Sequence, residues 1–310
     1  MKRLISYLFV AMITLSTSNV QSQTLAERLG YKSTDKLLIV NSDDAGMCHA
    51  ANSGTIEGME RGLISSSTIM TPCPWYNEIA AYAASRPDKD FGVHLTLTSE
   101  WSDYRWGTVA SKSEVPGLYD SEGYMWHSVE EVYASSNVEE ALIEGRAQID
   151  KALASGIAVT HLDSHMGTYQ YSPLYMDVYI QLADEYNLPI RMPSQSTVRI
   201  MNYPDVRTLC DEKGIIYPDY FIFEEFEDYD THNLDEFWTS YIKNLKPGVT
   251  EIYIHAATDT DEMRAITSSA THRNRELEFF TSDAAKKLIE DEGVIVIGYR
   301  PLLELQRRGR

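Results

Sequence analysis

The sequence contains few cysteines, and their arrangement excludes two common uses of thiols. Its 310 residues include three cysteines, Cys48, Cys73 and Cys210. An odd number at wide spacing is neither a disulfide framework nor the paired spacing of a thiolate zinc site. Two of the three could still pair in an oxidising compartment, and the sequence does not say which.

Positive charge is also scarce. Lys and Arg together number 27 against 46 Asp and Glu, which gives a formal net charge of -19. Binding to nucleic acid or to an anionic membrane surface needs Lys and Arg to neutralise phosphates. The charge balance therefore argues against both kinds of partner, whereas it places no obstacle to a neutral sugar.

Only the N-terminus carries a sustained apolar run. Lys2 and Arg3 precede apolar residues 4–15, and small and polar residues then lead to a plausible cleavage site near Ser22. This is the layout of a secretory signal peptide, and the run is too short for a spanning helix. We expect residues 1–22 to be removed and the protein to be exported to the periplasm or the exterior, with a retained membrane anchor as the alternative.

Residues 23–310 are predicted to form a single catalytic domain in which strands alternate with helices. Predicted strands cover 37–40, 66–70, 91–97, 158–165, 189–192, 251–256 and 294–299, and predicted helices cover 50–61, 76–84, 138–155, 174–186, 235–245 and 277–291. Continuous apolar strands between helices are typical of a parallel sheet covered on both faces. About seven such units in one chain favour a barrel, complete or incomplete, over an open sheet.

The segment 99–128 is too long to be a simple connection between two elements. It contains three tryptophans, Trp101, Trp106 and Trp126, together with several tyrosines. Because aromatic faces pack well on sugar rings, we predict that these tryptophans bind substrate. The alternative is a loop that packs its own small core.

Polar side chains stand where the predicted strands end. They are Asp43 and Asp44 after the first strand, His94 in the third, His161, Asp163 and His165 along the fourth, Arg191 in the fifth and His255 in a later one. The carboxyl ends of parallel strands share one rim, so these groups are expected to converge there. Carboxylates and imidazoles without thiolate suit Zn²⁺, Mg²⁺, Mn²⁺ or Co²⁺, and one Asp with two His leaves positions open for water and substrate. His161 lies deeper in its strand and could instead be a core residue.

The same positions carry a family resemblance. The run Asn41-Ser42-Asp43-Asp44-Ala45-Gly46 resembles the Asn-Ala-Asp-Asp-Phe-Gly signature of the YdjC-like carbohydrate deacetylases, also called the chitooligosaccharide deacetylase family. Four later stretches, 91–97, 160–165, 189–191 and 251–255, resemble further motifs of that family in the same order, and the similarity runs from about Lys36 to the end. Two departures, Met166-Gly167 after His165 and Ala256-Ala257 after His255, concern residues beside the site and affect substrate contacts.

The resemblance implies an α/β fold, a distorted (β/α) barrel of the polysaccharide deacetylase-like type. It implies one divalent metal ion, Zn²⁺ or Mg²⁺, with Asp44, His94 and His165 as ligands. It also implies that Asp43 is the general base, that Arg191 orients it, and that His255 is the general acid. The implied reaction is removal of an N-acetyl group from an amino sugar or a chitooligosaccharide-like oligosaccharide.

The sequence is also compatible with other functions. Another metal-dependent hydrolase on the same scaffold, such as a phosphoesterase or an amidase, would use similar ligands, but a phosphate substrate would need several cations and Arg191 is the evident one. A glycosidase with paired carboxylates would have little use for three histidines. An inactive sugar-binding relative is disfavoured by the presence of Asp43 and His255. The sequence is compatible with a monomer or a homo-oligomer.

Overall fold

The computed structural model describes residues 23–222 and 233–309, and the centre of this part is a parallel β-sheet. Seven strands build it: β1 (Lys36–Ala45), β2 (Ser66–Ile69), β3 (Phe91–Leu95), β4 (Val159–Ser164), β5 (Tyr220–Phe221), β6 (Gly248–Ile254) and β7 (Val294–Val296). Their order is β4-β3-β2-β1-β6-β5, with β7 paired to β1. Every pairing is parallel, so all the strands end at the same rim.

The central strand β1 organises the sheet because three strands pair with it. β6 pairs with residues 36–42 along one edge. Along the other edge, β7 pairs with residues 36–38, and β2 pairs with β1 from residue 41 onward. The sheet therefore divides next to β1, and the result is a curled half-barrel. This confirms the predicted α/β barrel-type fold in its incomplete form.

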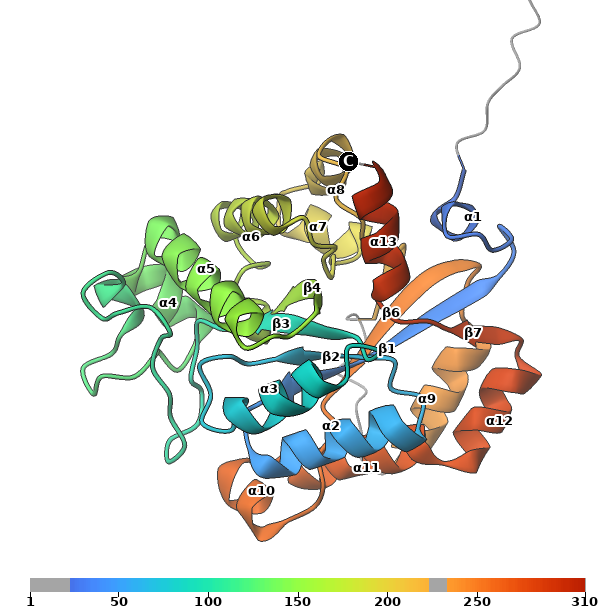
Figure 1. The fold of residues 1–310 in the computed structure, drawn as a ribbon, viewed down its shortest axis with the longest axis horizontal. Helices are drawn as coiled ribbons and strands as arrows, with labels where there is room; N and C mark the ends of the chain where they lie inside the picture. The colour runs from blue at the N-terminus through green and yellow to red at the C-terminus, as the bar shows by residue number, and fades with distance from the viewer. Residues whose placement is uncertain (1–22, 223–232, 310) are drawn as a thin grey trace, which may run out of the picture.

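Helices surround this sheet. They are α1 (Leu25–Arg28), α2 (His49–Arg61), α3 (Tyr76–Ser85), α4 (Val129–Ser135), α5 (Val138–Ala154), α6 (Pro173–Tyr186), α7 (Gln195–Ile200), α8 (Val206–Glu212), α9 (Leu234–Lys243), α10 (Asp261–Ile266), α11 (Ala270–Thr281), α12 (Asp283–Asp291) and α13 (Arg300–Gly309), with 3₁₀ turns η1 (Pro116–Leu118) and η2 (His165–Gly167). Figure 1 shows α2, α11 and α12 along one side of the sheet and α5, α6 and α13 along the other. None of the helices in the described ranges is long and apolar enough to cross a membrane.

Burial on both faces explains why the strands are apolar throughout. Along β1, Leu38 and Val40 belong to the large hydrophobic cluster, whereas Leu37 and Ile39 belong to a second cluster with Tyr299. Successive side chains of a strand point to opposite faces, so a strand covered on both sides needs an apolar residue at every position. The run 37–40 meets that requirement.

Two predicted elements differ from the structure. Residues 189–192 do not form a strand: Ile190 makes only an isolated bridge to Leu162 of β4, although this bridge still aligns Arg191 with the rim. The helix predicted over 277–291 is two helices, because Ser282 ends α11 and its side chain caps α12 by accepting a hydrogen bond from the Ala285 N–H. The predicted signal peptide, residues 1–22, lies outside the described residues.

Candidate metal and catalytic site

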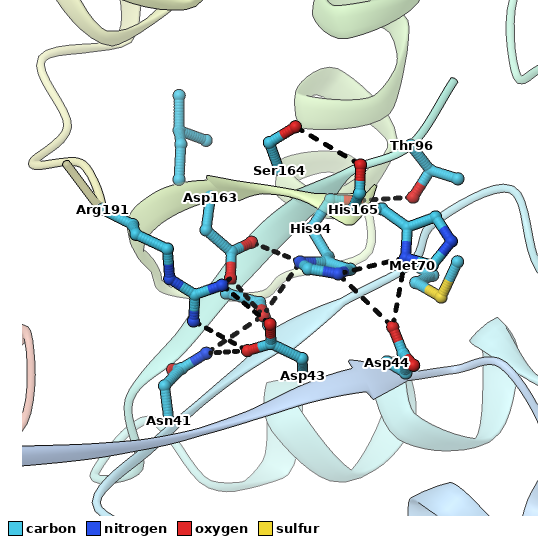
Figure 2. A network of polar contacts seen from close by, with 12 residues as sticks. Asn41, Asp43, Asp44, Met70, His94, Thr96, Asp163, Ser164, His165 and Arg191 are labelled. Carbon is cyan, nitrogen blue, oxygen red and sulfur yellow. Dashed lines mark hydrogen bonds and ion pairs between the residues drawn. The ribbon is translucent and has the colours of Figure 1, made fainter. Parts of the chain in front are cut away.

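Asp43 and Asp44 are consecutive residues at the carboxyl end of β1, yet both side chains reach the rim (Figure 2). A regular strand would send them to opposite faces. Opposite β2, Ser42 pairs with Ser67 and Ala45 with Ile69, so β1 contains one extra residue between these pairs. Asp44 is that irregular position, with φ of 65°, a left-handed conformation that Asp tolerates better than most residues. The bulge thus places two adjacent carboxylates in one site.

Three side chains from three strand ends meet with the spacing of metal ligands. Asp44 Oδ1 lies 3.3 Å from His94 Nε2 and 3.3 Å from His165 Nδ1. The two imidazole nitrogens are also 3.3 Å apart. Ligand atoms at about 2.0–2.1 Å from an ion in a tetrahedral arrangement stand about 3.3–3.4 Å from one another. The triangle therefore fits a small divalent cation with further positions open.

The Asp44 carboxylate gives a second indication of a bound cation. Its Oδ2 accepts a hydrogen bond from Arg273 Nη1 at 2.7 Å. Its Oδ1 is buried and has no hydrogen-bond partner among the described residues. A buried carboxylate oxygen without a partner is costly, whereas an ion within the triangle would satisfy it.

Each imidazole of the triangle is held at its other nitrogen by a carboxylate. His94 Nδ1 lies 2.6 Å from Asp163 Oδ1, and His165 Nε2 lies 3.0 Å from Glu100 Oε2. Burial lowers the pKa of both histidines, but the surrounding carboxylates outweigh it and raise the pKa of His94 to about 10 and that of His165 to about 9. The site is thus electrostatically suited to positive charge, which a divalent cation would supply in place of the imidazole protons.

Asp43 stands beside the triangle and is held by Arg191. The guanidinium donates from Nη1 to Asp43 Oδ2 at 2.7 Å and from Nη2 to Oδ1 at 2.8 Å, and Asn41 Nδ2 donates to Oδ1 at 2.8 Å. Burial raises the pKa of Asp43, but Arg191 more than compensates and the pKa falls to about 2. Asp43 is therefore ionised, and its Oδ2 keeps a free lone pair.

Arg191 is shared by three carboxylates in the interior of the half-barrel. Besides Asp43, its Nη1 lies 3.0 Å from Asp163 Oδ2 and its Nε donates to Glu251 Oε1 at 2.8 Å. Oxygens of Asp43 and Asp163 and a nitrogen of His94 also lie within 4.8 Å of one another. Because the guanidinium already binds both of these carboxylates, that second group is unsuited to a cation, and the triangle at Asp44 is the better site.

His255 follows β6 and is more open to solvent than the triangle, with 27% of its side chain exposed. Its Nε2 lies 3.9 Å from Asp44 Oδ2, and its backbone N–H donates to Glu276 Oε2 at 2.8 Å. Burial and the nearby Arg273 lower the pKa of His255, despite the carboxylates around it. The imidazole is thus a comparatively strong acid when it is protonated.

The tryptophans of the long segment lie at different depths. Trp106 is 3% exposed, and its Nε1–H donates to the Thr98 carbonyl oxygen at 2.9 Å. Trp126 is half-buried and donates to the Gly117 carbonyl oxygen at 2.8 Å, while Trp101 packs edge-on against Trp106 with ring centres 5.6 Å apart. The segment therefore packs Trp106 into a core that it shares with residues such as Met47 and Met263, and Trp101 and Trp126 keep partial exposure.

Two residues near the site, His161 and Glu100, do not belong to the predicted ligands or catalytic groups. His161 stacks on Tyr299 with ring centres 3.8 Å apart, and burial lowers its pKa, so it is the core residue that its depth in the strand suggested. Glu100 was not among the predicted site residues. It begins a loop, and no spacing along the chain reveals that it reaches His165.

Comparison with known proteins agrees with this geometry. Residues 37–291 match the family profile described as YdjC-like protein. The chain belongs to the YdjC-like family. It is 30% identical over 265 residues to a carbohydrate deacetylase of Thermoanaerobacter pseudethanolicus, a match that covers 85% of this chain and 98% of the relative.

Further similarities extend over most of the chain. A carbohydrate deacetylase of Enterococcus faecalis is 30% identical over 274 residues, covering 87% of this chain and 99% of the relative. Among solved structures, an Enterococcus faecalis V583 protein named for cellobiose-phosphate cleavage superimposes with a TM-score of 0.74 at 29% identity, over 87% of this chain and 99% of that one. The resemblance drawn from the motifs is thereby confirmed, and so is the fold.

Proposed function

We propose that this protein is a metal-dependent carbohydrate deacetylase that hydrolyses the N-acetyl group of an amino sugar or of a chitooligosaccharide-like oligosaccharide. The observation that carries the proposal is the ligand triangle of Asp44, His94 and His165 with the ionised Asp43 beside it. Membership of the YdjC-like family and two relatives named carbohydrate deacetylase support it.

The triangle would hold one divalent cation through Asp44 Oδ1, His94 Nε2 and His165 Nδ1. When bound, such an ion supplies Lewis-acid activation of a water molecule and of the acetyl carbonyl group. Of the two ions expected, Zn²⁺ fits two imidazoles and one carboxylate better than Mg²⁺, which prefers oxygen ligands.

The protein's own groups then divide the proton transfers. Asp43 accepts a proton from the attacking water at Oδ2, the oxygen with a free lone pair, while Arg191 fixes the plane of the carboxylate. His255, on the open side of Asp44, donates a proton to the departing amine. An amine is a poor leaving group unless it is protonated, so this step is necessary for the C–N bond to break.

A sugar suits this site better than a phosphate ester. Arg191 and Arg273 are 3% and 7% exposed, and both are already bound to carboxylates of the site. They are therefore not free to bind a phosphate. We propose instead that the partly exposed aromatic rings of the long segment, Trp101 and Trp126, contact the sugar, with Trp106 supporting them from the interior.

The test is acetate release from a panel of N- and O-acetylated oligosaccharides by the protein as purified, after chelation, and after Zn²⁺ or Mg²⁺ is restored. We expect acetate from an N-acetylated sugar, loss of activity on chelation and recovery on addition of the ion. A metal-loaded protein that releases acetate from no acetylated sugar would contradict the proposed function.

A further inference from the structure

The imidazole of His165 is engaged at both nitrogens. Its Nδ1 belongs to the ligand triangle, 3.3 Å from Asp44 Oδ1 and 3.3 Å from His94 Nε2. Its Nε2 lies 3.0 Å from Glu100 Oε2. Because a carboxylate accepts the hydrogen bond here, a singly protonated His165 carries its proton on Nε2, and the lone pair of Nδ1 then points into the triangle.

Glu100 does not come from the same part of the molecule as the corresponding partner of His94. His94 is held by Asp163, which is fully buried in β4 and also accepts a hydrogen bond from Thr68. Glu100 follows β3 at the start of the long segment 99–128, and its side chain is 18% exposed. One ligand is thus oriented by the sheet and the other by a loop.

The loop is anchored so that Glu100 has a fixed place. On one side of Glu100, the Ser99 N–H donates to the Trp126 carbonyl oxygen at 2.7 Å, and Ser99 Oγ accepts from the Trp106 N–H at 3.1 Å. Farther along, the Tyr104 hydroxyl donates to the Met47 carbonyl oxygen at 2.6 Å. The first of these contacts joins the two ends of the segment next to Glu100, and the last ties the segment to Met47, three residues after Asp44.

The same loop also contacts the imidazole ring itself. Trp106, almost completely buried, packs edge-on against His165 with ring centres 6.4 Å apart. His165 is therefore restrained by the hydrogen bond that it donates to Glu100 and by packing against Trp106. Groups that orient a ligand in this way commonly change metal affinity about 10–100-fold when they are removed.

We propose that Glu100 is a positioning residue that holds His165 in the tautomer and orientation required for cation binding, and that segment 99–128 is in this way part of the metal site. The inference rests on the ligand set of the proposed function. It goes beyond that function because it gives the segment a role in metal binding, in addition to any contact with substrate.

The test measures metal binding without substrate. Metal-free mature protein is titrated with Zn²⁺ against a chromophoric chelator, and the visible absorption spectrum of the Co²⁺-loaded protein is recorded. We expect Glu100→Ala to weaken Zn²⁺ binding about 10–100-fold and to change the Co²⁺ spectrum. Glu100→Gln, which keeps an oxygen that can accept the Nε2–H, should lose less. Asp103→Asn, an exposed carboxylate three residues along the same loop, is the matched control and should bind as the parent protein does.

Other outcomes would overturn the inference. Zn²⁺ affinity and a Co²⁺ spectrum that are unchanged in both Glu100 variants would show that the contact orients nothing. An effect confined to KM for an oligosaccharide would make Glu100 a substrate contact instead. A parent protein that binds no Zn²⁺ in the titration would also overturn the inference, because there would then be no metal site for Glu100 to support. If Glu100→Ala fails to fold, Glu100→Gln decides alone. A parent protein that binds Zn²⁺ but releases no acetate would defeat the proposed function and leave this inference standing.

Discussion

At the scale of single residues, the adjacent carboxylates Asp43 and Asp44 have different surroundings and are therefore suited to different roles. Asp44 faces two imidazoles and has an oxygen without a hydrogen-bond partner in the described structure. Asp43 is saturated by Arg191 and Asn41 except at one lone pair of Oδ2. The left-handed backbone of Asp44 allows one short stretch of chain to supply both groups.

Substitution of each carboxylate should separate the two roles. Asp44→Ala should abolish stoichiometric binding of the divalent ion, because it removes one of three ligands. Asp43→Asn should keep the ion but lower kcat/KM about 10²–10⁴-fold, the usual contribution of a general base. Metal content by elemental analysis and acetate release would be measured on both proteins. Full metal content in Asp44→Ala would show that the ligand set is wrong.

In the proposed mechanism, the pKa of His255 determines the alkaline side of the pH–rate profile. A general acid must be protonated, so activity falls as pH rises through its pKa. Burial and Arg273 lower that pKa from its ordinary value of 6.5, which moves the alkaline limb of kcat/KM to lower pH. We expect the limb below pH 6.5 in the parent protein and its disappearance in His255→Ala. A limb that persists unchanged in the variant would belong to another group.

The leaving group provides a control for the same assignment. The leaving group of an acetamide is an amine, which needs a proton in order to depart. The leaving group of an activated acetate ester departs without one. His255→Ala should therefore lower the rate on the amide far more than on the ester. An equal loss on both substrates would make His255 a positioning or structural residue.

At the scale of elements, the long segment 99–128 combines a structural interior with a partly exposed side. Glu144 of α5 accepts hydrogen bonds from the Val109 and Ala110 backbone N–H groups at 2.9 and 2.8 Å and so attaches the segment to the domain. Trp106 is buried in a core with Met47 and Cys48, while Trp101 packs at its margin. The two tryptophans should therefore respond differently to substitution.

Trp106→Ala should destabilise the protein by about 3–5 kcal/mol, as is usual when a buried aromatic ring is removed. Trp101→Ala should change stability less and should raise KM for an oligosaccharide more than for a small acetylated substrate. Chemical denaturation and steady-state kinetics on both variants would test this. Equal KM effects of Trp101→Ala on large and small substrates would mean that the ring does not contact the sugar.

Strand β6 carries a buried acid, Glu251, that links folding stability to pH. Its Oε2 accepts a hydrogen bond from the Tyr299 hydroxyl at 2.5 Å, and burial outweighs Arg191 and raises its pKa from 4.5 to about 7. Between these two values the native state retains a proton that the unfolded state has lost. The stabilisation of the folded state that comes from the raised pKa of Glu251 is therefore complete below pH 4.5 and is lost as pH rises through 7.

Glu251→Gln is neutral at every pH, so its free energy of unfolding should depend less on pH than that of the parent protein between pH 4.5 and 7. Urea denaturation at several pH values measures the difference. Glu290→Gln, an exposed acid of α12, is the control and should follow the parent curve. Parallel curves for the parent and Glu251→Gln would show that Glu251 is ionised throughout this range.

At the scale of the whole molecule, the apolar run at the N-terminus is the basis for a proposal about where the protein works. We propose that residues 1–22 direct export and that the mature protein begins near Gln23. Expression of the full chain in a bacterial host, cell fractionation and N-terminal sequencing would test this. Cytoplasmic protein that starts at Met1 would contradict the proposal.

Much of this molecule follows from its sequence alone. Apolar runs such as 37–40 specify strands buried on both faces, because an alternating pattern would have left one face polar. Parallel strands share one rim, so the order of strands and polar residues was sufficient to expect the polar side chains to converge there. The family resemblance then selected Asp44, His94 and His165 as ligands, and these three side chains do lie together. The sequence pattern was a poorer guide at residues 189–192, which were predicted to form a strand but contact β4 through one isolated bridge.

Tertiary structure alone decided the contacts that depend on long-range geometry. The bulge that turns Asp44 into the site depends on register with β2, which no pattern within β1 encodes. The sharing of Arg191 by Asp43, Asp163 and Glu251 depends on three strands that are distant in the chain. Glu100 reaches His165 because a folded loop places it there, and loop conformation is set by packing rather than by periodicity. The sequence determined which chemical groups gather at the rim, whereas the folded chain determined which atom of each group faces the others.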